Sequence, residues 1–98
     1  MAKKRFRLVA RVSSADLGAV KPVLQSAVGV PAKESGGELV VEGRMEGESA
    51  KGLNRSLLSA MRRVEKRTRL RAEWTSDDGT TQRFFDYVLK KETRAAPS

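Results

Sequence analysis

An alternation of apolar and mostly basic side chains across residues 5–12 limits the possible folds more than any other feature. The apolar side chains are Phe6, Leu8, Ala10 and Val12, and between them stand Arg5, Arg7, Val9 and Arg11. Successive side chains of a strand point to opposite faces, so this pattern predicts a strand with one buried face. Such a strand needs a second layer of structure to cover its apolar side.

Two amphipathic segments can supply that layer. Ser13, Ser14 and Asp16 form a helix-start signal, and apolar side chains at helical spacing follow it: Leu17, Val20, Leu24 and Val28. Pro22 lies inside this segment, so we expect a kinked helix, or one that begins near Lys21. A second helix is expected after a Ser49 N-cap, with this apolar stripe: Ala50, Leu53, Leu57, Ala60, Met61 and Val64.

Alternation recurs in three other stretches. Residues 38–46 predict a strand that ends at Gly47, and residues 69–75 predict another. The Asp77-Asp78-Gly79 turn leads into a last strand over residues 81–90, and a short extended piece is possible over residues 30–33. On the final hairpin we expect Trp74, Phe85, Tyr87 and Leu89 to face the core and Phe84 to face outward.

The element order is therefore β-α-(β)-β-α-β-β, which predicts an α+β fold. We expect a ferredoxin-like sheet of four or five strands with two helices on one face. Residues 1–4 are expected to form a basic N-terminal arm, residues 5–90 a single domain and residues 91–98 a disordered tail. The chain lacks a long apolar run and a signal-peptide pattern, so we expect a cytoplasmic protein that does not associate with membranes.

The chain contains no cysteine and no histidine. This composition removes disulfides, thiol nucleophiles, the usual general base and the preferred zinc ligands. The sequence therefore predicts no catalytic residues, no metal site and no cofactor, and we expect a binding protein rather than an enzyme.

The formal net charge is +8 and is unevenly distributed. Residues 51–72 carry eight basic side chains, and Glu65 is their one acidic neighbour. Such a block is typical of polyanion binding, so we expect a nucleic-acid-associated protein, with RNA more favoured than DNA. The protein would bind the phosphate backbone through basic helix 50–67, the adjacent strand and the basic N-terminal arm. The candidate residues are Lys3, Lys4, Lys51, Arg55, Arg62, Arg63, Lys66, Arg67, Arg69 and Arg71.

Other interpretations stay open. The basic helix face can simply be solvated, with cations favoured near the helix C-terminus. The sheet-face arginines can pair across strands with these acidic side chains on the same face: Glu38, Glu42, Glu46 and Glu73. We favour this pairing for most of that face. The alternative function is a protein-interaction or homodimerisation module without intrinsic activity, whose partner is an acidic protein or a second copy.

The stretch from Leu39 to Val64, a strand followed by a helix with spaced leucines and arginines, resembles one known family. This is the small dimerising subunit of the archaeal and eukaryotic complex that threonylcarbamoylates tRNA. The resemblance covers about a quarter of the chain, and the final hairpin departs from that family's pattern. No residue role follows from it.

Overall fold

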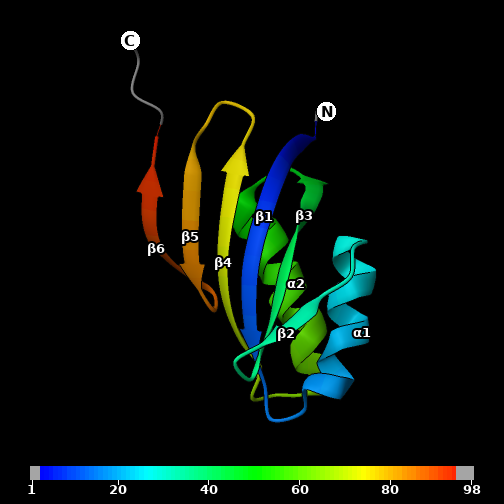
Figure 1. Ribbon diagram of the computed structural model, residues 1–98. Helices are drawn as coiled ribbons and strands as arrows, with labels where there is room; N and C mark the ends of the chain where they lie inside the picture. The colour runs from blue at the N-terminus through cyan, green and yellow to red at the C-terminus, as the bar shows by residue number, and fades with distance from the viewer. Residues whose placement is uncertain (1–2, 95–98) are drawn as a thin grey trace.

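The computed structural model describes residues 3–94 and consists of one antiparallel sheet covered on one side by two helices (Figure 1). Six strands lie in the order β2-β3-β1-β4-β5-β6. Their bounds are β1 Lys4–Ser13, β2 Lys33–Ser35, β3 Glu38–Gly47, β4 Arg69–Ser76, β5 Thr81–Phe85 and β6 Val88–Thr93. The helices are α1 Leu17–Val28 and α2 Ala50–Val64. The α+β class is confirmed, but the sheet has six strands instead of four or five, and the ferredoxin-like order is not confirmed.

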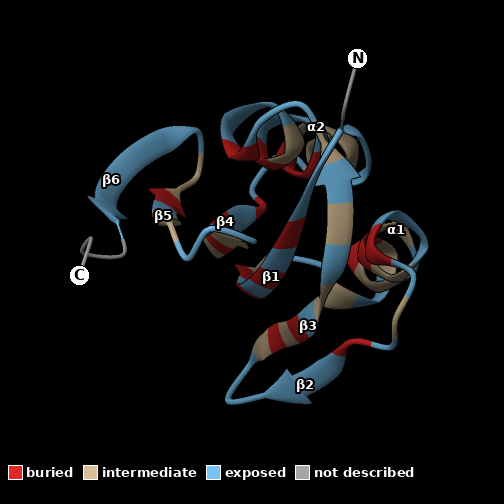
Figure 2. Ribbon diagram, turned by 90° about the horizontal axis from the view of Figure 1, so that it is seen from above, coloured by how far each residue is buried: buried red, intermediate tan, exposed pale blue. Residues whose placement is uncertain are grey.

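The core lies between the helices and the central strands β3, β1 and β4. Figure 2 shows both helices on one side of the sheet, with β5 and β6 extending beyond α2. The sheet contributes Phe6, Leu8, Ala10, Val12, Leu39, Val41, Leu70, Ala72 and Trp74, all buried as the alternation predicts. In the part of the chain that the structure describes, the other side of the sheet carries no helix, and we call it the open face. Within residues 3–94, no helix is long and apolar enough to cross a membrane.

Helix α1 begins at Leu17, where the Asp16 carboxylate accepts a hydrogen bond from the Ala19 amide (3.1 Å). The expected late start near Lys21 is therefore wrong. Pro22 lies inside the helix and donates no hydrogen bond, yet the helix continues past it to Val28. A left-handed Gly29, with φ of 82°, ends the helix.

Helix α2 is capped by Ser49 as predicted, but its buried face is rotated from the expected stripe. Leu58 and Asn54 are buried, whereas Val64 is 49% exposed. The Asn54 side chain accepts a hydrogen bond from Trp74 Nε1 (3.1 Å) and donates one to the Asp86 carbonyl (2.7 Å). A buried indole N–H needs a polar partner, so a polar residue occupies what periodicity treats as an apolar face.

The expected single strand over residues 81–90 is wrong, because a turn at Asp86 and Tyr87 divides it into β5 and β6. Phe84 pairs with Ala72 of β4 and is buried, whereas Phe85 pairs with Arg71 and faces the open side. The two phenylalanines therefore exchange their expected faces. Tyr87 and Leu89, which we expected in the core, are exposed because they follow the turn.

Strand β6 reaches Thr93, so regular structure continues past residue 90, where the sequence predicts the domain to end. Of the predicted tail, residues 95–98 lie outside the described residues. Residues 1–2 of the predicted arm also lie outside them, and Lys4 belongs to β1.

Gly43 on β3 allows the end of α1 to approach the sheet closely. A Cβ at this position would lie 2.6 Å from Val28 Cγ1 and 3.1 Å from a methyl group of Val30. We expect Gly43→Ala to lower the free energy of unfolding by roughly 1–3 kcal/mol, the usual cost of overpacking. The measurement is urea denaturation followed by Trp74 fluorescence.

Gly18→Ala is the matched control, because the new Cβ would meet its nearest atom at 3.4 Å, an ordinary contact. In a helix this change should stabilise the protein by up to about 1 kcal/mol. Equal effects of the two substitutions would contradict the close-approach argument.

Candidate nucleic-acid interface

The open-face arginines of β1 are paired with glutamates of β3. Arg5 lies 3.7 Å from Glu46, Arg11 lies 3.5 Å from Glu38, and Arg7 hydrogen-bonds Glu42. Glu73 of β4 is likewise paired, because its carboxylate lies 3.4 Å from the guanidinium of Arg83. Exposed pairs such as these add little stability, but they neutralise charge. The hypothesis of cross-strand pairing is confirmed for this part of the sheet.

Asp86 engages two of the candidate cations. Its carboxylate lies 3.5 Å from the guanidinium of Arg62 and 3.2 Å from that of Arg69. Arg62 also donates from Nε to the Thr68 carbonyl (2.9 Å), and its guanidinium lies 5.2 Å from the centre of the Tyr87 ring. Arg62 therefore joins α2 to the β5–β6 turn, a structural role that leaves less of its charge available to a ligand.

Five other candidate cations are exposed and lie on α2 or in the loop that follows it. Within residues 3–94, no carboxylate lies within 4.0 Å of their charged groups, although Glu65 Oε1 accepts a hydrogen bond from the backbone amide of Arg67 (3.1 Å). We call them the unpaired α2 cations, and they are Lys51, Arg55, Arg63, Lys66 and Arg67. These five residues form the local excess of positive charge that the sequence predicts. Arg62 does not belong to it, because it pairs with Asp86.

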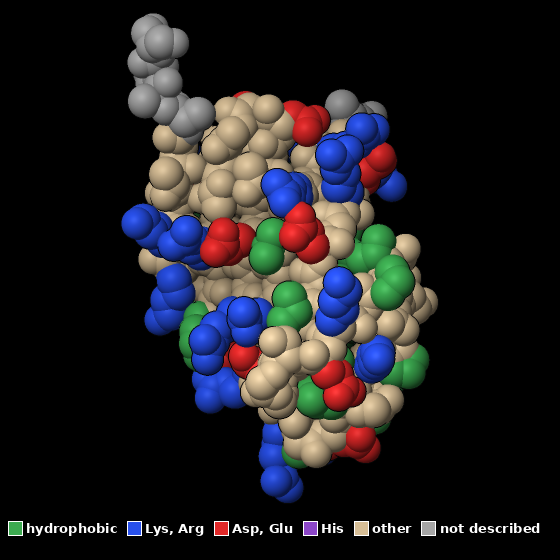
Figure 3. All heavy atoms as spheres, in the orientation of Figure 1, with side chains coloured by type: hydrophobic (Ala, Val, Ile, Leu, Met, Phe, Trp, Pro, Cys, Tyr) green, Lys and Arg blue, Asp and Glu red, His purple; other side chains and the backbone are tan. Residues whose placement is uncertain are grey.

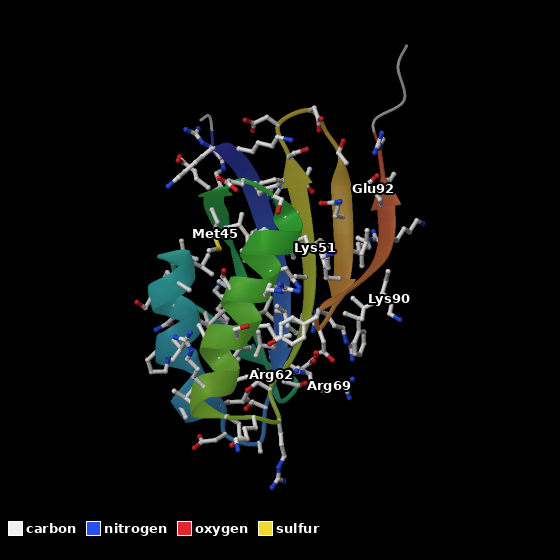
Figure 4. The ribbon with its side chains drawn as sticks, turned by 180° about the vertical axis from the view of Figure 1, so that it is seen from behind. Met45, Lys51, Arg62, Arg69, Lys90 and Glu92 are labelled. Atoms are coloured by element: carbon white, nitrogen blue, oxygen red, sulfur yellow. The ribbon has the colours of Figure 1, made fainter. Side chains whose placement is uncertain are left out.

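The ten candidate residues do not form one surface. Lys51 and Arg62 project from the side of α2 that faces β4 and β5 (Figure 4), and Arg63 belongs to the last turn of α2. Arg69 and Arg71 of β4 lie over the Phe85 ring on the opposite, open face of the sheet, although Arg69 and Arg62 meet at the Asp86 carboxylate. Chain connectivity links the two layers, because α2 leads through residues 65–68 directly into β4.

Lys3 and Lys4 lie apart from these groups, beside a hollow of about 970 Å³ at the end of the sheet. Acidic side chains share its lining, including Asp78 and Glu92. The Ser76 hydroxyl, followed by the Thr80 amide, lowers the pKa of Asp78 to about 2. Arg94 and then Gln82 lower the pKa of Glu92. Both carboxylates stay ionised at neutral pH, so Lys3 and Lys4 lie in a region of mixed charge.

Within residues 3–94, no three acidic side chains converge as possible metal ligands.

The structure adds an aromatic side chain to the open face that the sequence analysis missed. Phe85 is half-buried there, with the guanidiniums of Arg69 and Arg71 at 5.1 and 5.6 Å from its ring centre. Figure 3, which looks onto this face, shows Lys and Arg side chains gathered over the β4–β6 part of the sheet. The sequence signal that indicates this arrangement is Asp86. It is a polar residue inside an apolar run, and it marks the turn between β5 and β6.

A comparison of this chain with protein-family models, with curated proteins and with solved structures finds no match. The resemblance of residues 39–64 gains no support from these comparisons. Function is therefore inferred from geometry and charge.

Proposed function

We propose that this protein binds nucleic acid, RNA in preference to DNA, through the phosphate backbone. The observation that carries the proposal is the set of unpaired α2 cations. Carboxylates pair with Arg5, Arg7 and Arg11 on the sheet, yet within residues 3–94 no carboxylate lies within 4.0 Å of the charged groups of these five. The proposed role is binding without catalysis, in the cytoplasm.

The arrangement of these cations suits a backbone ligand. Lys51 and Arg55 lie four residues apart, about one turn, along α2, and Lys66 and Arg67 lie in the loop that follows its C-terminal end. Lysine and arginine contacts to phosphate displace condensed counterions, and this displacement supplies most of non-specific affinity. Such contacts carry no base information, so binding through this surface is weakly sequence-specific.

The test is the salt dependence of binding, measured by fluorescence anisotropy with a labelled single-stranded RNA and a duplex DNA. We expect log affinity to fall linearly with log salt, with a slope of about −0.7 per neutralised phosphate on a single strand and about −0.9 on duplex DNA. Five contacts would give a single-strand slope of about −3.5. A flat salt response, or the absence of binding at low salt, would overturn the proposal.

A second candidate function is self-association through β6. This strand is the edge of the sheet, and its Val88 and Leu89 are 56% and 45% exposed. An edge strand offers unpaired amides and carbonyls to another strand. Light scattering tests self-association independently of RNA binding. A tight dimer that Val88→Lys converts to a monomer, without loss of RNA affinity, would support self-association through β6.

A further inference from the structure

We propose that a shallow hollow on the open face holds one unpaired base of a single-stranded nucleic acid. The proposal deepens the function above and rests on it. The hollow has a volume of about 310 Å³, and its lining includes Val9, Arg71, Glu73, Arg83, Phe85 and Lys90. This volume is at the low end of the roughly 300–1,000 Å³ found for small-molecule sites, so it suits a single planar ring better than a larger ligand.

The lining offers planar groups on which a base can stack. Phe85 pairs directly with Arg71 across β4 and β5. The guanidiniums of Arg69 and Arg71 lie over its ring, at 5.1 and 5.6 Å from the ring centre, so ring and guanidiniums together form the planar surface. Aromatic rings and guanidinium planes are the surfaces that proteins use to hold unstacked bases. Val9, 37% exposed, adds apolar surface from β1 on the other side of Arg71 and Glu73.

Charge around the hollow matches the phosphates that flank a base. Four cationic residues line it against one carboxylate, that of Glu73. Two of these four cations are already paired: Arg83 lies 3.4 Å from Glu73, and Arg11 lies 3.5 Å from Glu38. In the described part of the chain, Arg71 and Lys90 have no carboxylate within 4.0 Å and remain available to phosphates.

A single strand fits these features better than a duplex or an acidic peptide does. Bases in a duplex are stacked on one another and cannot lie flat on a sheet. An acidic peptide satisfies the cations but leaves the Phe85 ring and Val9 without a planar partner. The hollow therefore favours an occupant that combines an apolar planar ring with negative charge on either side, which is an unpaired nucleotide.

The experiment compares a ten-residue oligoadenylate RNA with a ten-unit abasic RNA, which has the same phosphates and no bases. Stacking on one platform contributes about 5- to 150-fold in affinity per base. We expect the wild-type protein to bind oligoadenylate tighter than the abasic strand by a factor in this range. Phe85→Leu should abolish the difference because it removes the ring, and Phe85→Tyr should preserve it because the ring remains.

A measurement on the unmodified protein guards against loss of folding in the variants. Oligoadenylate should shift the Phe85 ring proton resonances upfield, and the abasic strand should not. If Phe85→Leu leaves the affinity ratio unchanged, or both strands bind equally with a steep salt slope, the base site is wrong while backbone binding stands. If neither strand binds in 50 mM salt, the proposed function itself fails. Binding of a ten-residue polyglutamate that depends on Phe85 would assign the hollow to an acidic protein and overturn the proposal.

Discussion

Replacement of Lys51, Arg55 and Lys66 by glutamine is expected to remove most of the salt sensitivity of RNA binding. Each neutralised phosphate contributes about 0.7 to the slope on a single strand, so the slope should become shallower by about 2.1. Between 50 and 200 mM salt the wild-type protein then loses about 20-fold more affinity than the variant. All three side chains are exposed, and we expect the melting temperature to change little.

The matched control removes the same charge from α1 and from the β2–β3 end of the sheet. Lys21 of α1, Lys33 of β2 and Arg44 of β3 are also without a carboxylate within 4.0 Å in the described part of the chain. Their replacement by glutamine lowers the net charge equally but should leave the slope within about 0.7 of the wild-type value. Equal losses in the two variants would mean that net charge, and not the α2 surface, attracts the ligand.

Local pattern was sufficient to predict the central layer of this fold. The alternation of residues 5–12 placed Phe6 and Leu8 correctly on the buried face, and that of residues 69–75 placed Trp74 there, because a period of two determines the face once the strand exists. The same rule put Arg7 on the same face as the glutamates of residues 38–46, and Glu42 is its partner. These inferences depend only on side-chain parity and on the short range of ion pairs.

Pattern failed where one polar residue changes the parity or the helical face. The turn at Asp86 interrupts the alternation, so Phe84 is buried and Phe85 lies on the open face of the sheet. Asn54 rotates the buried side of α2 because Trp74 requires a hydrogen-bond acceptor. Both depend on contacts between residues far apart in sequence, which periodicity does not contain. The pairing of Arg62 with Asp86 was missed for the same reason, and it alters the candidate site directly.

Asp86→Ala is expected to lower the free energy of unfolding by about 2–5 kcal/mol. The carboxylate accepts a hydrogen bond from the Leu70 amide (2.9 Å), and its loss leaves that part-buried donor unpaired, at a cost of about 1–3 kcal/mol. Asp86 also adopts a φ of 55°, where alanine is strained by about 1–2 kcal/mol. Asp86→Gly separates the two contributions, because glycine relieves the strain but keeps the unpaired amide. Urea denaturation measures all the variants.

Asp86→Asn separates charge from backbone geometry and connects the turn to the proposed function. Asparagine tolerates the left-handed backbone and can still accept from the Leu70 amide, so we expect a loss of only about 1 kcal/mol. It no longer neutralises Arg62 and Arg69, whose guanidiniums become available to phosphates. Stability should therefore fall while RNA affinity at low salt rises and the salt slope steepens by up to about 1.4. An unchanged slope would mean that neither arginine reaches the bound strand.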